Sequence, residues 1–224
     1  MKKIICFLLV LVCLFACVSC NVKDKIQDTA GDLLGNFGKK STVEDISETI
    51  GASKPTKIVT RSEYVGEDTL TAMYTTLVDR NSGKTQFDFE YQRYADIEDM
   101  LPTSIMTVAG SVTYNADGSV TSASGESWTA EEAMGYLAES IHVDASGFSS
   151  YELTNGGNSL KAYVPVSESV RIFGTAIDAD GDILLEIETN GKYLYSVKVS
   201  YTANDTGAAV VISTSYDYAL VTLD

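Results

Sequence analysis

The sequence has little of the equipment on which many enzymes and disulfide-bonded proteins depend. All four cysteines lie within the first twenty residues, and His142 is the single histidine of the 224 residues. No cysteine follows Cys20, so a domain exported without the first nineteen residues cannot form an internal disulfide. Its stability has to come from its apolar core. A single histidine also excludes a metal centre built from several histidines. We expect no catalytic residue, no metal site and no cofactor.

Basic residues are scarce as well. The chain has 16 Lys and Arg against 31 Asp and Glu, which gives a formal net charge of −15. Removing Lys2 and Lys3 with the segment before Cys20 changes this charge to −17. Nucleic-acid binding needs clustered Lys and Arg, and no such cluster is evident along the sequence. Anionic lipid headgroups would repel the chain too, so membrane attachment is expected to depend on something other than a basic face.

The first nineteen residues have the pattern of a secretory signal peptide. Lys2 and Lys3 give a positive start, residues 4–18 are almost continuously apolar, and the small Ser19 precedes the expected cut. About 15 apolar residues are too few for a comfortable bilayer span. We therefore predict that residues 1–19 are removed and take no part in the fold.

The cysteine at the expected cut needs another explanation. Cys17-Val18-Ser19-Cys20 resembles the lipobox of bacterial lipoproteins, in which the thiol is diacylated before signal peptidase II cleaves on its amino side. The lipobox usually begins with Leu, where this chain has Cys17. The overlapping segment Leu14-Phe15-Ala16-Cys17 supplies the Leu but places the bulky Phe15 before Ala16. The resemblance implies lipidation of Cys20, with Cys17 and an ordinary cleaved signal peptide as the alternatives.

Acyl chains would attach even an acidic protein to a membrane, because each buried CH₂ contributes about 0.8 kcal/mol. The predicted location is therefore extracytoplasmic, on the surface of the cell membrane.

Residues 20–55 are expected to form a lipidated helical segment. Apolar residues recur at three- and four-residue steps between Val22 and Phe37, which is typical of an amphipathic helix. Ser41 and Glu44 form a capping box ahead of a second helix that carries Ile46 and Ile50. Gly51 and Pro55 are expected to end this helix.

Residues 56–224 change to the two-residue period of β-strands and are predicted to form one domain. Phe87, Phe89 and Tyr91 alternate with polar residues, which indicates an antiparallel strand with one wet face. Asn190-Gly191 is the strongest short hairpin signal, and the strand after it should place Tyr193, Tyr195, Val197, Val199 and Tyr201 on one face. The predicted strands lie near residues 56–65, 69–79, 84–95, 105–114, 118–124, 148–154, 159–166, 169–178, 182–189, 192–202 and 208–219.

One helix is expected to interrupt these strands. Thr129 and Glu132 form a capping box, and Met134, Leu137 and Ile141 follow on one apolar stripe. The expected fold class is therefore α+β, mainly antiparallel β-sheet, with an internal helix and an N-terminal helical segment. This order of elements resembles that of the LolA and LppX/LprG-like lipoprotein carriers. The resemblance implies a curved sheet or half-barrel around an apolar cavity for acyl chains, but no shared motif assigns functional residues.

Three polar groupings could support chemistry. His142 with Asp144 could act as a catalytic base, but we interpret His142 as a residue near a helix end, and no Gly-x-Ser-x-Gly elbow supplies a nucleophile. Asp178, Asp180 and Asp182 surround Gly181 in a composition that suits Ca²⁺. An EF-hand would require a Glu where Thr189 stands, so we interpret the segment as a turn and keep calcium as the alternative. The pairs Asp88/Glu90 and Glu186/Glu188 are interpreted as solvated strand faces rather than glycosidase carboxylates.

Aromatic residues are the most suggestive feature, with 13 Tyr, 7 Phe and one Trp. Such stripes either line a ligand cavity or form the packed face of a sheet. We predict a non-enzymatic binding protein that encloses a hydrophobic or lipid ligand between the sheet and the internal helix. The alternative is a structural module of the cell envelope with a filled core that binds a protein or glycan. The candidate ligand-binding residues are Phe87, Phe89, Tyr91, Met134, Leu137 and Ile141.

Overall fold

The structure is a computed structural model that describes residues 41–66, 69–94, 105–125 and 141–223. Several predicted features lie outside these residues. They are the signal peptide, both candidate lipidation sites Cys17 and Cys20, the helix expected at 22–37, and the internal helix with Met134 and Leu137.

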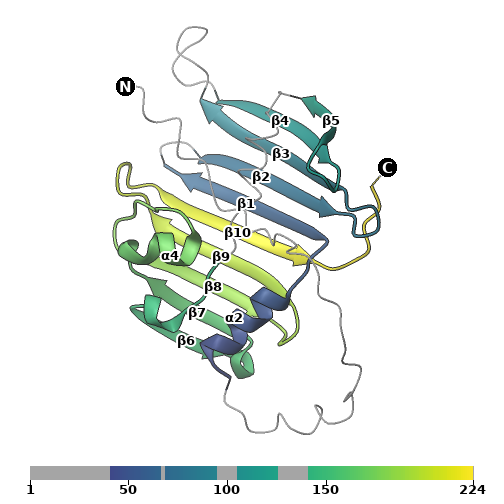
Figure 1. Cartoon of the computed structure of the whole chain (residues 1–224). Coiled ribbons are helices and arrows are strands. Elements are labelled where there is room, and N and C mark those ends of the chain that lie inside the picture. The colour runs from purple at the N-terminus through teal and green to yellow at the C-terminus, as the bar shows by residue number, and fades with distance from the viewer. Residues whose placement is uncertain (1–40, 67–68, 95–104, 126–140, 224) are drawn as a thin grey trace, which may run out of the picture.

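One antiparallel sheet of ten strands dominates the described residues (Figure 1). Its order is β5-β4-β3-β2-β1-β10-β9-β8-β7-β6, so two meanders run outward from a central pair formed by β1 and β10. The strands are β1 (Lys57–Val65), β2 (Thr69–Val78), β3 (Thr85–Tyr94), β4 (Ile105–Tyr114), β5 (Val120–Gly125), β6 (Ser150–Thr154), β7 (Ser159–Val164), β8 (Ile183–Thr189), β9 (Leu194–Thr202) and β10 (Ala209–Asp217). Ten of the eleven predicted strands are thereby confirmed.

Helices contribute little to the described part of the chain, so the protein is predominantly β and the expected α+β class is met only in part. The α-helices are α2 (Val43–Ala52) and α4 (Ser169–Phe173), and the single 3₁₀ turns are η1 (Ala145–Gly147), η2 (Asn155–Gly157) and η3 (Val166–Glu168). Both α-helices lie on the same face of the sheet, over the half that contains β7, β8 and β9 (Figure 1).

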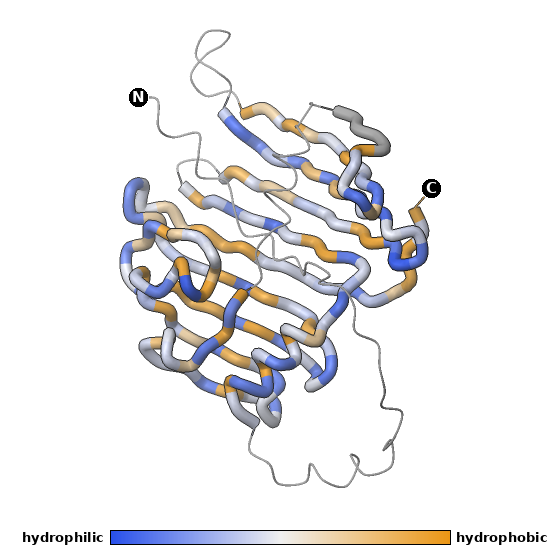
Figure 2. The backbone as a smooth tube through the Cα atoms, viewed as in Figure 1, coloured by the Kyte–Doolittle hydropathy of each residue, from blue (hydrophilic) through white to orange (hydrophobic). Residues whose placement is uncertain are grey.

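The two faces of the sheet differ in burial because side chains alternate along each strand. We call one face the covered face; Ile58, Phe87, Leu185 and Ile212 lie on it, with exposed fractions of 6% or less. The opposite face is called the open face, and it carries Arg61, Met73, Glu186, Lys198 and Ser213 in one row across neighbouring strands. Figure 2 shows the corresponding alternation of hydrophobic and polar residues along the strands.

Helix α2 begins one residue later than the sequence suggests. Thr42 is the N-cap and Asp45 completes the capping box, since each side chain accepts a hydrogen bond from the other residue's backbone N–H. The expected box of Ser41 and Glu44 was therefore wrong by one position. Ile46 and Ile50, which the helix carries as expected, are both buried.

The strand predicted at 169–178 was wrong, because α4 occupies residues 169–173. The neighbours Ile172 and Phe173 are 0% and 1% exposed. A strand would place adjacent side chains on opposite faces, whereas a helix directs both into the core. Gly174 then ends the helix in the left-handed conformation, with φ of 72°, and its N–H donates to the carbonyl of Val170.

The β8–β9 hairpin is confirmed, but its loop is longer than Asn190-Gly191 suggested. Thr189 pairs with Leu194, so residues 190–193 form the loop, and the Asn190 side-chain oxygen accepts from the N–H groups of Lys192 and Tyr193. The strand is irregular at its start, because Leu194 is buried and Tyr195 is 47% exposed. Tyr195 therefore does not share the face of Val197 and Val199, contrary to expectation.

Two hydrophobic clusters fill the covered face. The first joins α2, α4 and strands β7 to β10, and includes Ile46, Phe173, Ile183 and Leu185. The second belongs to β2, β3 and β4, and consists of Ala72, Tyr74, Phe87, Phe89, Val108, Val112 and Tyr114, with Tyr91 packed against it. Buried Thr60 and Thr214 lie between them on β1 and β10, and their hydroxyl oxygens are 3.0 Å apart.

Candidate functional site

The aromatic residues predicted to bind a ligand come together in the second cluster. Phe87 and Phe89 are 0% and 3% exposed, and Tyr91 is half-buried. The ring centroids of Phe87 and Phe89 are 6.2 Å apart, and those of Phe89 and Tyr91 are 6.3 Å apart. Tyr74 on β2 stacks on Phe87 at 6.0 Å with an interplanar angle of 11°. The four rings form a continuous aromatic surface.

Strand β4 borders this surface with small and branched side chains. Its register places Val112 opposite Phe87, Gly110 opposite Phe89 and Val108 opposite Tyr91. The glycine opposite Phe89 contributes no side chain to the covered face. Burial raises the pKa of Tyr114 at the end of the same strand. The side chains that surround the aromatic rings in this cluster are thus hydrophobic and buried.

Ile141 was expected to face these aromatic residues but belongs to the first cluster. It is 6% exposed and packs with residues of α2, α4 and β7 to β10. The structure therefore does not bring Ile141 together with Phe87, Phe89 and Tyr91 in one cluster.

The loop that contains His142 is held by an ion-pair network. His142 is exposed, and its backbone N–H donates to the carbonyl of Ile172 at 2.9 Å. The Asp144 carboxylate accepts from the N–H and hydroxyl of Ser146, each at 2.9 Å, and pairs with Arg171. The hydrogen bonds from Ser146, aided by Arg171, lower the pKa of Asp144. Arg171 also pairs with Glu168 at 2.6 Å, so these charges stabilise the loop.

The acidic segment Asp178–Asp182 is an exposed connection that leads into β8. Asp182 accepts a hydrogen bond from the Ser149 hydroxyl at 2.5 Å, and Gly181 adopts φ of 87°, as a tight turn requires. Within the part of the chain that the structure describes, no three His, Cys, Asp or Glu residues lie close enough together to hold a metal ion.

The paired carboxylates lie on the open face and are engaged by their neighbours. Asp88 accepts from Gln86 at 2.9 Å and from the Ser111 hydroxyl at 2.5 Å. Glu186 pairs with Lys198 at 3.3 Å, and Glu188 accepts from Ser196 at 3.2 Å. These arrangements match a solvated sheet face with cross-strand polar pairs.

A polar contact that the sequence did not reveal joins Asp79 to the C-terminal tail. Its carboxylate accepts from the N–H groups of Asn81, Ser82 and Leu223 at 2.8, 3.2 and 3.2 Å. These bonds, that from Leu223 first, lower the pKa of Asp79 to about 2. The turn residues after Asp79 indicate the local bonds, but no local pattern indicates a partner 144 residues away.

Comparisons with known proteins add no assignment. No model of a known protein family matches the chain, and no curated protein matches it significantly. Among the helices in the described ranges, none is both long and apolar enough to span a membrane.

Proposed function

We propose that this chain is a lipoprotein of the bacterial cell envelope that is attached through acyl chains on Cys20 and binds a hydrophobic ligand without catalysing a reaction. In this proposal the sheet curves into a half-barrel, and the internal helix expected after Thr129 closes the cavity. The membrane is reached through the acyl chains, and the ligand is a lipid or an acylated molecule.

The observation that carries the proposal is the aromatic surface of the second cluster. The buried side chains of α2 and α4 belong to the first cluster, whereas the second cluster consists of residues from β2, β3 and β4 (Figure 1). The residues of the second cluster are nevertheless as deeply buried as those of the first. Tyr74, Phe87, Phe89 and Tyr91 offer about 150–250 Å² of ring and side-chain area each, which is enough to cover several methylene groups. The hydroxyls of Thr60 and Thr214 border the cluster and would suit the ester or hydroxyl of an acylated ligand.

The proposal is tested by identifying what leaves with the purified protein. The Cys20→Ser variant is used so that no covalent acyl chain is counted, and bound lipid is extracted and measured by mass spectrometry. We expect Phe89→Ala in this background to reduce the retained lipid by about tenfold, which corresponds to about 1.4 kcal/mol of binding free energy.

Phe173→Ala is the matched control, because the same substitution opens a cavity of similar size in the first cluster. Each variant should lose about 3–5 kcal/mol of stability, so only the lipid content separates them. The proposal is wrong if the parent protein carries no lipid, or if both variants lose lipid equally.

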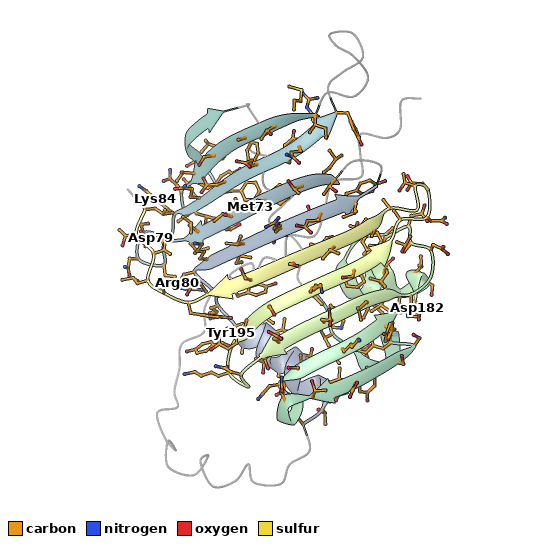
Figure 3. All side chains as sticks on the ribbon, turned by 180° about the vertical axis from the view of Figure 1, so that it is seen from behind. Met73, Asp79, Arg80, Lys84, Asp182 and Tyr195 are labelled. Carbon is orange, nitrogen blue, oxygen red and sulfur yellow. The ribbon has the colours of Figure 1, made fainter. Side chains whose placement is uncertain are left out.

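The alternative, a structural module that binds a protein or glycan, is favoured by the open face. Two exposed tyrosines lie on it, Tyr163 of β7 and Tyr195 of β9. Figure 3 labels Tyr195. A lipid-free parent protein would make this the preferred function.

A further inference from the structure

Strand β6 forms one edge of the sheet, and among the described residues no strand pairs with its outer side (Figure 1). Its inner side pairs with β7 from Ser150 to Thr154 in a continuous register. Alternate residues of an edge strand direct their backbone N–H and C=O groups away from the sheet, where a further strand can bond to them. β6 therefore offers main-chain donors and acceptors to a partner.

This edge lacks most of the features that keep sheets from adding strands. Such features are Lys or Pro residues, bulges, and a covering helix or loop. β6 contains neither Lys nor Pro, and four of its five residues are exposed. Its pairing with β7 has no register shift, whereas β5 at the other edge pairs with β4 through a shift between Thr113 and Tyr114. The β6 edge is therefore the more regular and accessible template.

The side of this edge that belongs to the covered face is apolar. Tyr151 and Leu153 lie on it, since they pair with the buried Ala162 and Leu160 of β7. Tyr151 is 50% exposed, and its ring meets that of Phe148 edge-on with centroids 6.1 Å apart. Leu153 packs against the first cluster. Apolar side chains of an added strand would contact Tyr151 and Leu153 and extend the first cluster outward.

The other side of the edge continues a row of alternating charges on the open face. Glu152 lies opposite Lys161 of β7. Lys161 in turn lies opposite Glu186 of β8, and Glu186 forms an ion pair with Lys198 of β9 at 3.3 Å. The Lys161 ammonium lies 6.0 Å from the ring centroid of Tyr163, and within the described ranges Glu152 forms no ion pair. A cation on the outer side of Glu152 would continue the alternation.

Other carboxylates close to the edge favour a partner of the same sign. Asp182 accepts a hydrogen bond from Ser149, the residue before β6. In the loop that leads to β6, Asp144 shares the cation of Arg171 with Glu168. The whole chain has 16 Lys and Arg against 31 Asp and Glu. A cationic partner is therefore attracted both by the edge and by the protein as a whole.

From these observations we propose that β6 binds an extended segment of a cationic polypeptide, which adds to the sheet as a further strand. The segment carries Lys or Arg opposite Glu152 and apolar residues opposite Tyr151 and Leu153. Main-chain hydrogen bonds to β6 supply the affinity, and the alternating side chains supply the specificity. This surface is separate from the lipid site proposed on the second cluster, so either proposal can fail without the other.

A second copy of this chain is a less suitable occupant of the edge. β6 has no cation to set against Glu152, and two copies with a formal net charge of −15 each repel one another. A symmetric pairing centred on Glu152 would also bring two carboxylates directly opposite each other, which destabilises antiparallel strands. Self-association through β6 would contradict the proposal.

The first experiment measures the binding of three fluorescent peptides to the full chain by anisotropy. The basic peptide, Thr-Val-Lys-Val-Lys-Val-Thr, alternates apolar and cationic residues, and the acidic peptide has Glu in place of Lys. The third is the basic peptide with its central backbone nitrogens methylated, so that it keeps its charge but loses those donors. We expect the basic peptide to bind at least about fivefold more tightly than the acidic one, and the methylated peptide not to bind measurably.

Charge exchange at the edge tests the role of Glu152. Glu152→Lys should weaken binding of the basic peptide about fivefold and strengthen binding of the acidic peptide by a similar factor, because opposite charges across a strand pair attract and like charges repel. The matched control is Glu90→Lys, which makes the same change in net charge at an exposed residue of the same row on the interior strand β3. It should leave the ratio of the two affinities unchanged. Thermal unfolding verifies that both variants fold.

Hydrogen exchange locates the bound peptide. The basic peptide should slow the exchange of the β6 amides and leave those of β5 unchanged. The proposal is overturned if no peptide binds, if the methylated peptide binds as well as its parent, if Glu152→Lys keeps the original preference, or if protection falls on other strands. A dimer that protects β6 without any peptide also overturns it and assigns the edge to a second copy.

Discussion

At the scale of single residues, Asp79 links two segments of the chain, the β2–β3 turn and the C-terminal tail. Its carboxylate holds the β2–β3 turn through Asn81 and Ser82 and the C-terminal tail through Leu223. The next residue, Arg80, donates to the carbonyls of Lys54 and Pro55. Two adjacent residues therefore hold the strand that enters the sheet and the tail that leaves it.

The lowered pKa of Asp79 predicts a pH-dependent stability. A carboxyl whose pKa is about 2 in the folded protein and about 4 in the unfolded chain contributes its full stabilisation above pH 4. That contribution is lost as the pH falls from about 4 towards 2. We expect Asp79→Asn to lower the unfolding free energy at neutral pH and to flatten its acid dependence, measured by urea denaturation between pH 5 and 2.5.

Asp117 provides the control for this prediction. It also has a lowered pKa, caused by hydrogen bonds from Ser119, but these bonds stay within one turn. Asp117→Asn should change the acid dependence without loosening the C-terminal tail. An equal loss of tail protection in hydrogen exchange for both variants would contradict the role assigned to Asp79.

At the scale of elements, substitutions at the start of α2 test whether the helix is capped by Thr42 and Asp45, as observed, or by Ser41 and Glu44, as the sequence suggested. Thr42→Ala removes the oxygen that accepts from the N–H of Asp45, and we expect it to lower the unfolding free energy by about 1 kcal/mol. Glu44→Gln should change it by no more than about 0.5 kcal/mol, because Glu44 is exposed. Chemical denaturation of both variants decides between them, and a larger loss for Glu44→Gln would contradict the observed cap.

Local patterns predicted most of the strands because alternation and turn residues act over a few positions. Phe87, Phe89 and Tyr91 were placed on one buried face correctly for this reason. Ser169–Phe173 was misjudged because its apolar residues fit either a strand or a short helix, and only packing against the first cluster decides. The irregular start of β9 at Tyr195 has the same kind of cause.

Site prediction depended on contacts between distant segments and was less complete. The aromatic group on β3 could be found because its members are two residues apart. The meeting of Asp79 with Leu223 could not be found, because no local pattern connects residues that are 144 positions apart.

At the scale of the whole molecule, the pairing of β1 with β10 unites the two meanders. Thr60 and Thr214 face each other in this pair, and both are buried. Replacing one partner leaves a buried hydroxyl without its bond, whereas replacing both by an apolar residue of the same shape removes the unpaired group. The pair therefore lends itself to a double-mutant cycle.

We expect Thr60→Val and Thr214→Val each to lower the unfolding free energy by about 1–3 kcal/mol, and the double variant to lose less than the sum. Denaturant unfolding of all four proteins measures this coupling. Thr76→Val on β2 is the control, a buried threonine outside the pair, and it should combine additively with Thr214→Val. Additivity of Thr60→Val with Thr214→Val would show that the hydroxyls do not interact.

The place of the last strand has a consequence for synthesis. The central pairing joins residues 154 positions apart, so nearly the whole domain has to emerge before β10 can insert between β1 and β9. Until then both of those strands present bare hydrogen-bonding edges, to which other unfinished chains can add. Messages truncated before residue 209 should therefore yield aggregates rather than a smaller, partly functional sheet.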